Sequence, residues 1–254
     1  MAAIGNPSET AASAASADPR RPWSPSLKKK VFGWALVLWS GFPLSMIYVF
    51  GLGGDRGAGG NFVSLTYVAG LYGMLTAPWL RSSGLRDRPW QERLEVSVTI
   101  WLWIAYIAAV TWELPFVLFF DTIVANADQA WTFVWLPYAE GGDSRYHEFD
   151  PTIMTLESLA SFNGVIGLTA LWFWYRSDRT ATLPLVVFLV TASSHLYSTV
   201  QYYAVDALTG FPSVGDSFVF DLLLKFLVIN SAFIIMPLCT IVWVVTRLPK
   251  RLSA

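Results

Sequence analysis

The chain has 254 residues, of which 54% are apolar and only 14% carry a charge, and its net charge is −1. Ordinary soluble domains contain about 25% charged residues, so this chain has too little polar surface to cover a soluble globule. Without a basic patch no nucleic-acid partner is expected, and the composition predicts a polytopic membrane protein.

The first residues differ in composition from the rest. Residues 1–27 are rich in Ala, Ser and Pro, and they lack the charged-then-apolar layout of a cleaved signal peptide. This composition predicts a disordered tail, so targeting is expected to depend on the first apolar segment. The single cysteine, Cys239, lies in an apolar run, which excludes an intramolecular disulfide and predicts a buried structural thiol.

Six apolar segments are long enough to cross a bilayer, for which a helix needs about 20 apolar residues. They cover residues 31–51, 61–80, 96–120, 154–175, 183–205 and 219–246. The second segment is the weakest, because it contains several Gly and polar residues. The short alternating strands of a membrane barrel are missing from the pattern. The sequence therefore predicts an all-α, polytopic transmembrane helix bundle with six spans.

Positive charges fall on one side of the membrane in this arrangement. Arg and Lys precede the first segment, lie between the second and third and between the fourth and fifth, and follow the sixth, whereas the other loops hold only Arg56 and Arg145. By the positive-inside rule, both termini are expected in the cytoplasm, including a C-terminal tail at 248–254. The long loop at 121–153, which is acidic and aromatic, is then expected on the outer side.

Polar side chains from four of the predicted spans fall in the outer half of the bilayer, where such groups are costly and are functional candidates by default. Glu113 lies ~10 Å below the outer end of the third span, at 1.5 Å per residue. Glu157 lies near the start of the fourth span, His195 lies in the fifth, and Asn230 lies in the sixth. If these side chains face inward, they line one cavity that opens to the membrane and is closed by the loop at 121–153.

Each of these residues also has a purely structural explanation. Glu113 could serve only a helix kink at Pro115, and Glu157 could be an interfacial acid favoured by the helix dipole. His195 could hydrogen-bond a backbone carbonyl, and Asn230 could join two helices. Both kinds of explanation stay open at the level of sequence.

Two acids in an apolar pocket are suited to moving a proton to and from an alkene. An apolar environment favours the neutral form of a carboxylic acid, which can then deliver a proton near pH 7. The carbocation that forms would be stabilised by a carboxylate and by the faces of aromatic rings. The substrate would be an apolar lipid that enters sideways from the bilayer.

Other kinds of site find little support in the sequence. His147 and His195 belong to no metal-ligand motif, so no metal site is expected. The sequence has no Gly-rich phosphate loop and no nucleophile elbow, and no cofactor is expected. Asp221 and Lys225 stand at i, i+4 near the outer end of the sixth span and are interpreted as a structural ion pair.

Several stretches of the chain resemble motifs of one known family, in the same order. The loop sequence WLPYAEGGDSRY, residues 135–146, resembles the W-x-x-Y-x-x-G-D-S-R-Y signature of the emopamil-binding protein family, with one extra Gly. The stretches WELPFVLFFD, TIMTLESLASFNG, ASSHLYSTVQYY and FLVINSAFIIMPL are similar to span motifs of this family. The family comprises the sterol Δ8–Δ7 isomerases of the EXPERA superfamily, and the resemblance covers about residues 60–246.

The resemblance implies an EXPERA-like membrane domain of five spans at 61–247, preceded by an additional N-terminal span and loop at 28–60. It implies that Glu113 and Glu157 are catalytic acids, which protonate a sterol alkene and remove a proton nearby. It also implies residence in the endoplasmic reticulum membrane and a membrane lipid or isoprenoid as the partner, and it allows a homodimer. Of the expected substrate-binding residues, Tyr146 and Asn230 match family residues. The full expected set is Trp112, Tyr146, His195, Tyr197, Asn230 and Phe233.

The chain departs from the family pattern at several positions. Ala109 stands where the family has a His one turn before the first Glu, Phe233 stands in place of a Trp, His195 in place of a Gln, and Thr199 in place of an acid. The loss of the His favours a variant in which the same acids start the cationic cyclisation of a prenyl chain, as in fungal meroterpenoid cyclases that resemble this family. A third alternative is a non-catalytic sterol- or amine-binding membrane protein.

Overall fold

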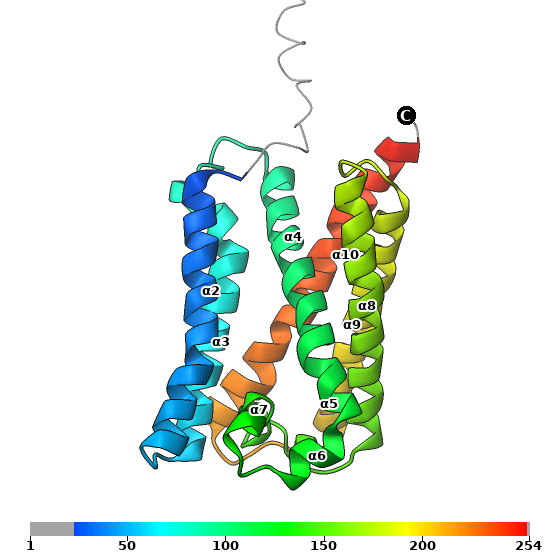
Figure 1. Cartoon of the computed structure of the whole chain (residues 1–254). Coiled ribbons are helices and arrows are strands. Elements are labelled where there is room, and N and C mark those ends of the chain that lie inside the picture. Colours follow the sequence, from blue (N-terminus) through cyan, green and yellow to red (C-terminus); the bar gives the residue numbers. More distant parts are fainter. Residues whose placement is uncertain (1–22, 253–254) are drawn as a thin grey trace, which may run out of the picture.

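The computed structural model describes residues 23–252, and every regular element in this range is a helix. Of the tail expected at 1–27, residues 1–22 lie outside the described range, and the first helix begins just after them. The long helices are α2 (Pro25–Met46), α3 (Arg56–Thr76), α4 (Trp90–Ala108), α8 (Pro151–Arg176), α9 (Leu183–Thr209) and α10 (Asn230–Leu252), which run side by side in Figure 1. The predicted all-helical class is confirmed for the described residues, and α10 continues into the segment expected as a C-terminal tail.

Five stretches of helix are long and apolar enough to cross a membrane, which indicates a multi-pass membrane protein. Three of them combine an α-helix with a wider, π-helical stretch: η1 (Ile47–Gly51) extends α2, η4 (Ala109–Glu113) extends α4 and leads into α5 (Leu114–Leu118), and η7 (Phe218–Ile229) precedes α10. The five stretches coincide with the first, third, fourth, fifth and sixth expected spans. They are Pro25–Gly51, Trp90–Leu118, Pro151–Arg176, Leu183–Thr209 and Phe218–Leu248.

Helix α3, the second expected span, is not among these five. Its glycines bring it very close to α2: a Cβ on Gly70 would lie 2.5 Å from Cβ of Leu38, and a Cβ on Gly73 would lie 2.2 Å from the ring of Trp34. Small residues at such contacts let two helix backbones approach each other in a membrane protein. Two of the glycines that lower the hydropathy of α3 are therefore the ones that pack it against α2.

We expect Gly70→Ala to lower the melting temperature of the detergent-purified protein, because overpacking a tight contact costs about 1–3 kcal/mol. Gly33→Ala on α2 is the matched control, since a Cβ at Gly33 meets nothing within 4 Å. If Gly70→Ala melts at the same temperature as Gly33→Ala, α2 and α3 can move apart at this contact without any loss of stability.

The segment between α5 and α8 and the loop at 210–217 fold together at one end of the molecule, and we call residues 120–150 with this loop the cap. The cap contains α6 (Phe120–Ala125), η5 (Ala130–Val134), α7 (Leu136–Ala139) and η6 (Ser144–Tyr146). Ser144 N donates to Ser213 O at 2.9 Å, and Gly215 N donates to Gly141 O at 2.8 Å. The cap lies at the bottom of Figure 1, opposite the C-terminal end of α10, and the short turns η2 (Ala77–Trp79) and η3 (Arg81–Ser83) lie at the other end.

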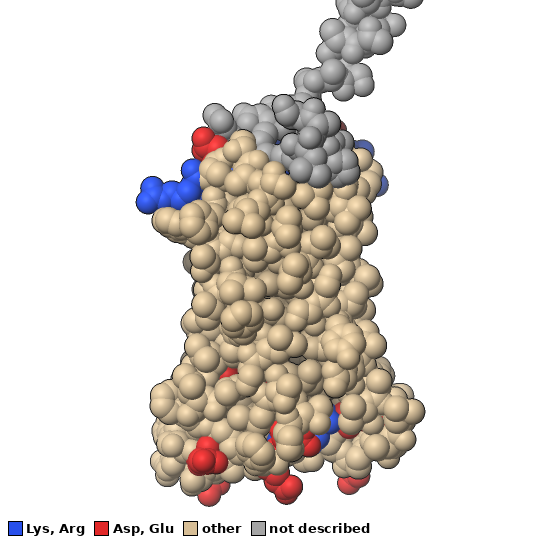
Figure 2. Space-filling model, turned by 90° about the vertical axis from the view of Figure 1, so that its right-hand side faces the viewer, with Lys and Arg blue, Asp and Glu red and all other residues tan. Residues whose placement is uncertain are grey.

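Apolar and charged residues are distributed unevenly along the long axis of the molecule. The largest buried apolar cluster includes Trp101, Trp174, Phe188 and Trp243, which lie on α4, α8, α9 and α10 away from the cap. In Figure 2 the charged side chains gather at the two ends of the face shown, and Asp and Glu predominate at the cap end. A middle section almost without charge is what a chain embedded in lipid requires.

Candidate functional site

A partly open cavity of about 230 Å³ lies beneath the cap, and its walls are mostly apolar. The helices α4, α8, α9 and α10, through their π-helical extensions where present, and the cap each contribute polar groups to it. The structure therefore brings together most of the residues that the sequence singled out. Those lining the cavity are Trp112, Glu113, Tyr146, Glu157, His195, Asn230 and Phe233.

Glu113 reaches the cavity from a widened helical turn. It ends the π-helical turn η4 and is followed closely by Pro115, which has no N–H with which to continue the helical hydrogen bonds. Turns of this kind occur frequently at functional sites. The Oε2 atom of Glu113 is buried and has no hydrogen-bond partner among the described residues. If Glu113 served only the helix kink, its carboxyl group would not need to reach the cavity. The unpartnered oxygen can instead bind a ligand.

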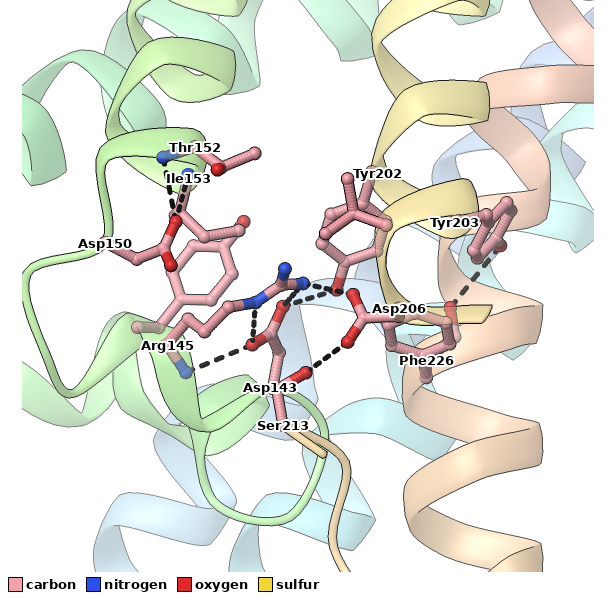
Figure 3. Close-up of polar contacts among 12 residues, drawn as sticks. Asp143, Arg145, Asp150, Thr152, Ile153, Tyr202, Tyr203, Asp206, Ser213 and Phe226 are labelled. Carbon is pink, nitrogen blue, oxygen red and sulfur yellow. Dashed lines mark hydrogen bonds and ion pairs between the residues drawn. The ribbon is translucent and has the colours of Figure 1, made fainter. Parts of the chain in front are cut away.

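Glu157 is not needed to cap the helix on which it lies. The N-terminus of α8 is capped by Asp150, whose Oδ1 accepts hydrogen bonds from the N–H groups of Thr152 at 2.8 Å and Ile153 at 2.9 Å (Figure 3). Glu157 instead accepts a hydrogen bond from the hydroxyl group of Tyr146. Its carboxyl group therefore belongs to the cavity wall and is oriented by the cap.

Aromatic rings make up much of the cavity wall. A cation inside the cavity would meet the faces or edges of these rings as well as two carboxyl groups, and each well-placed ring face contributes about 0.5–2 kcal/mol to binding a cation. The lining is thus suited to a positive charge that has little water around it. The aromatic residues are Phe42, Tyr67, Trp112, Phe116, Trp135, Tyr138, Tyr146, Tyr202 and Phe233.

A chain of hydrogen bonds leads from the cavity wall into the cap. Nδ2 of Asn230 donates to Oη of Tyr138 at 2.8 Å, the hydroxyl groups of Tyr138 and Tyr202 are 2.7 Å apart, and Oη of Tyr202 donates to Oδ2 of Asp143 at 2.7 Å. Because a phenol carries one hydrogen, the bond from Tyr202 to Asp143 requires that Tyr138 donates to Tyr202. The chain therefore has one direction, and it fixes Asn230 relative to the cap.

The Asp143 carboxylate is the centre of a buried ion cluster (Figure 3). It is fully buried and accepts hydrogen bonds from Nε of Arg145 at 2.9 Å and from Nη2 at 2.7 Å. The same Nη2 lies 2.5 Å from Oδ2 of Asp206 on α9, and Ser213 donates to the other oxygen of Asp206 at 2.6 Å. The Asp and Arg of the loop motif therefore lock the cap to α9, whereas Tyr146 of the same motif reaches the cavity.

Lys225 fastens the cap to η7. The expected pair of Asp221 and Lys225 is present, with 3.3 Å between Oδ1 and Nζ. The buried Nζ of Lys225 also donates to the backbone carbonyl of Glu140. Gly141, with φ of +91°, leaves no room for a side chain, since a Cβ would lie 2.3 Å from Oδ1 of Asp221. The Gly pair of the loop motif is therefore fitted to this contact.

We expect Tyr146→Phe to lower the melting temperature of the detergent-purified protein, because a hydrogen bond to a buried carboxyl group is lost while the ring stays. Burial, followed by the charge of Glu157, raises the pKa of Tyr146, so its phenol keeps the proton that it donates. Tyr197→Phe is the matched control, because the side chain of Tyr197 is exposed. If the melting temperature fell equally in both variants, the hydrogen bond from Tyr146 to Glu157 would contribute nothing to the site.

Tyr197, which was expected to bind substrate, does not line the cavity. Its side chain is 69% exposed on α9. Two residues along an α-helix correspond to a rotation of about 200°, so Tyr197 and the cavity-lining His195 point in nearly opposite directions. On a helix, a residue two positions from a cavity-lining residue is therefore not expected to line the same cavity.

Ala109, which stands where the family has a His, also points away from the cavity. It is 2% exposed and packs on α8, where a Cβ on Gly164 would lie 2.6 Å from the Ala109 Cβ. Ala108 lines the cavity instead. In an i→i+5 turn the residue that stacks over Glu113 is Ala108, one position earlier than in an α-helix. A His at position 109 would not fit between α4 and α8.

Part of the cavity wall could not be anticipated from the sequence. Phe42 of α2 and Ser64 and Tyr67 of α3 line the cavity, and the Phe42 ring lies 5.1 Å from that of Trp112. The N-terminal helix was expected to lie outside the EXPERA-like domain, and the boundary expected at 60/61 falls inside α3. No local signal marks these residues, since aromatic residues are common along every predicted span.

Neither a group of metal ligands nor a similar protein indicates the function of the cavity. In the range 23–252, no group of three or more His, Cys, Asp or Glu side chains is arranged to bind a metal ion. The chain matches no protein-family model and no curated protein. The chemistry of the cavity is therefore the guide to function.

Proposed function

We propose that the protein is an intramembrane isomerase that shifts an alkene in a sterol, of the Δ8–Δ7 type, through a carbocation. The observation that carries this proposal is that Glu113 and Glu157, from different helices, line one apolar cavity. One carboxylic acid adds its proton to an alkene carbon, and the positive charge forms on the other alkene carbon. A carboxylate then removes a proton from the adjacent carbon, so the double bond moves by one position and no proton is consumed overall.

The size of the cavity supports a lipid substrate that is only partly enclosed. Pockets that surround a whole drug-sized ligand measure about 300–1,000 Å³, whereas this cavity measures about 230 Å³. A sterol would therefore place its reacting alkene beneath the cap and leave the remainder among the helices or in the bilayer. This arrangement also suits entry from the membrane, because the rest of the lipid need not be extracted.

The aromatic lining favours a second candidate function, the cationic cyclisation of a prenyl chain. In such a reaction the positive charge moves from carbon to carbon, so rings are needed along its route and not only at one point. The rings of this cavity come from α2, α3, α9, α10 and the cap, as well as from η4 and α5 beside Glu113. Proton delivery and final proton removal would fall to Glu113 and Glu157 in this reaction too.

The proposal includes a topology and a location. We propose that α3 is the sixth span, because it packs along α2 and its glycines explain its low hydropathy. Both termini then face the cytoplasm, and the acidic cap faces the lumen of the endoplasmic reticulum. The Lys and Arg residues that flank the spans at the end opposite the cap support this orientation, since positive charges are retained on the cytoplasmic side.

The test is expression in a yeast strain that lacks its Δ8–Δ7 isomerisation step. Restored Δ7 sterols are expected if the protein is the proposed isomerase. Without them, turnover of a prenylated aromatic compound by membranes containing the protein would favour the cyclase. Failure of both, with saturable binding of a cationic amphiphile, would leave a binding protein without catalysis.

A further inference from the structure

One buried polar atom at the cavity has no partner and no role in the proposed proton transfer. His195 lines the cavity from α9 and is 5% exposed, and its Nε2 atom has no hydrogen-bond partner among the described residues. The rings of Tyr106 and Phe233 flank it, with centroids 6.4 Å and 6.3 Å from the imidazole. An imidazole in this setting needs a hydrogen bond from whatever fills the cavity.

The neighbouring polar groups are already engaged. Ser198 and Thr199 donate their hydroxyl hydrogens to the backbone carbonyl of His195, at 3.0 Å and 2.9 Å. The hydroxyl of Tyr106 is 2.6 Å from that of Thr191. These side chains therefore leave Nε2 of His195 to a ligand or to water.

His195 also lies at the end of the cavity away from the cap. It precedes Tyr202 by seven residues on α9, which corresponds to about 10 Å along the helix axis. Tyr202 is bonded to Tyr138 of the cap, and Glu157 is bonded to Tyr146 of the cap. The carboxyl group of Glu157 is thus bonded to the cap, whereas the unpaired imidazole lies deeper along the helices.

We propose that His195 binds the hydroxyl group of the substrate sterol and so determines how the sterol lies in the cavity. A hydroxyl group both donates and accepts, and it therefore pairs with either tautomer of the imidazole. With the hydroxyl group at His195, the alkene of the same molecule lies toward Glu113 and Glu157. This assignment of His195 rests on the proposed sterol reaction.

The test compares two sterols that differ only in this group. The purified full-length protein in lipid nanodiscs is titrated with a Δ8 sterol that has its 3-hydroxyl group and with the 3-deoxy form of the same sterol. The wild-type protein is expected to bind the hydroxylated sterol about 10-fold more tightly, and His195→Phe is expected to lose this preference. His195→Gln keeps a hydrogen-bonding side chain and is expected to retain most of it.

A matched control uses the second histidine of the chain. His147 lies in the cap and does not line the cavity, so His147→Phe is expected to keep the wild-type preference. Equal affinity of the wild-type protein for the two sterols would overturn the inference, because water would then satisfy His195. The inference also fails if His195→Phe melts normally and keeps the preference. Sterol turnover in yeast without any preference would leave the isomerase standing, whereas failure to bind either sterol would overturn both proposals.

Discussion

Glu157→Gln is expected to reduce turnover by about 10²–10⁴-fold while the protein is still made and folded, because an amide keeps the shape of the side chain but cannot transfer the proton. The hydroxyl group of Tyr146 that now donates to the carboxyl group can donate equally to the amide oxygen. The wall of the cavity is therefore expected to stay in place. The measurement is the rate of Δ7 sterol formation in membranes with equal amounts of each variant.

Glu113→Gln is expected to have an effect of the same size, for a partly different reason. The Oε2 atom of Glu113 is buried without a hydrogen-bond partner among the described residues, so no hydrogen bond of this atom is lost on substitution. A loss of turnover would then report on the reaction and not on the fold. If both acids act on one proton cycle, the double variant should be no slower than the slower single variant.

The control for both substitutions is Glu148→Gln, since Glu148 is an exposed acid of the cap that does not line the cavity. It is expected to show wild-type turnover. Full activity in either Glu113→Gln or Glu157→Gln would remove that residue from the mechanism, and full activity in both would leave the isomerase and the cyclase without their chemistry.

The two acids and Asn230 could be predicted from the sequence, because a polar residue within an apolar span is a strong local signal. The positions of the spans were predictable for the same reason, and only α3 falls short, since its glycines serve contact with α2. Such a contact depends on a second segment of chain, and hydropathy along one segment cannot reveal it.

What the sequence could not reveal is the rotation of each helix about its own axis. The π-helical turn before Glu113 shifts the helix by one residue, which turns Ala109 toward α8 and Ala108 toward the cavity. Tyr197 lies outside the cavity, which a motif pattern could not reveal because it does not show on which side of the helix a residue lies. The contribution of Phe42 depends on how α2 packs, which is a tertiary property.

Arg145→Met is expected to destabilise the protein strongly, because it leaves two buried carboxylates without their cation. The side chains of Asp143 and Asp206 are 0% and 2% exposed, and both bond to the guanidinium group. Removing one partner of a buried ion pair typically costs about 3–5 kcal/mol. Thermal unfolding of the detergent-purified protein measures the effect, and the cap is expected to detach before the spans separate.

The control is Arg88→Met, which removes an i, i+4 pair with Glu92 at 3.5 Å outside the cap. Such partly exposed pairs contribute about 0–1 kcal/mol, so little change in melting temperature is expected. Adding Asp143→Asn and Asp206→Asn to Arg145→Met should restore part of the lost stability, since the uncompensated charges are then gone. If Arg145→Met melts like Arg88→Met, the cluster does not lock the cap to α9.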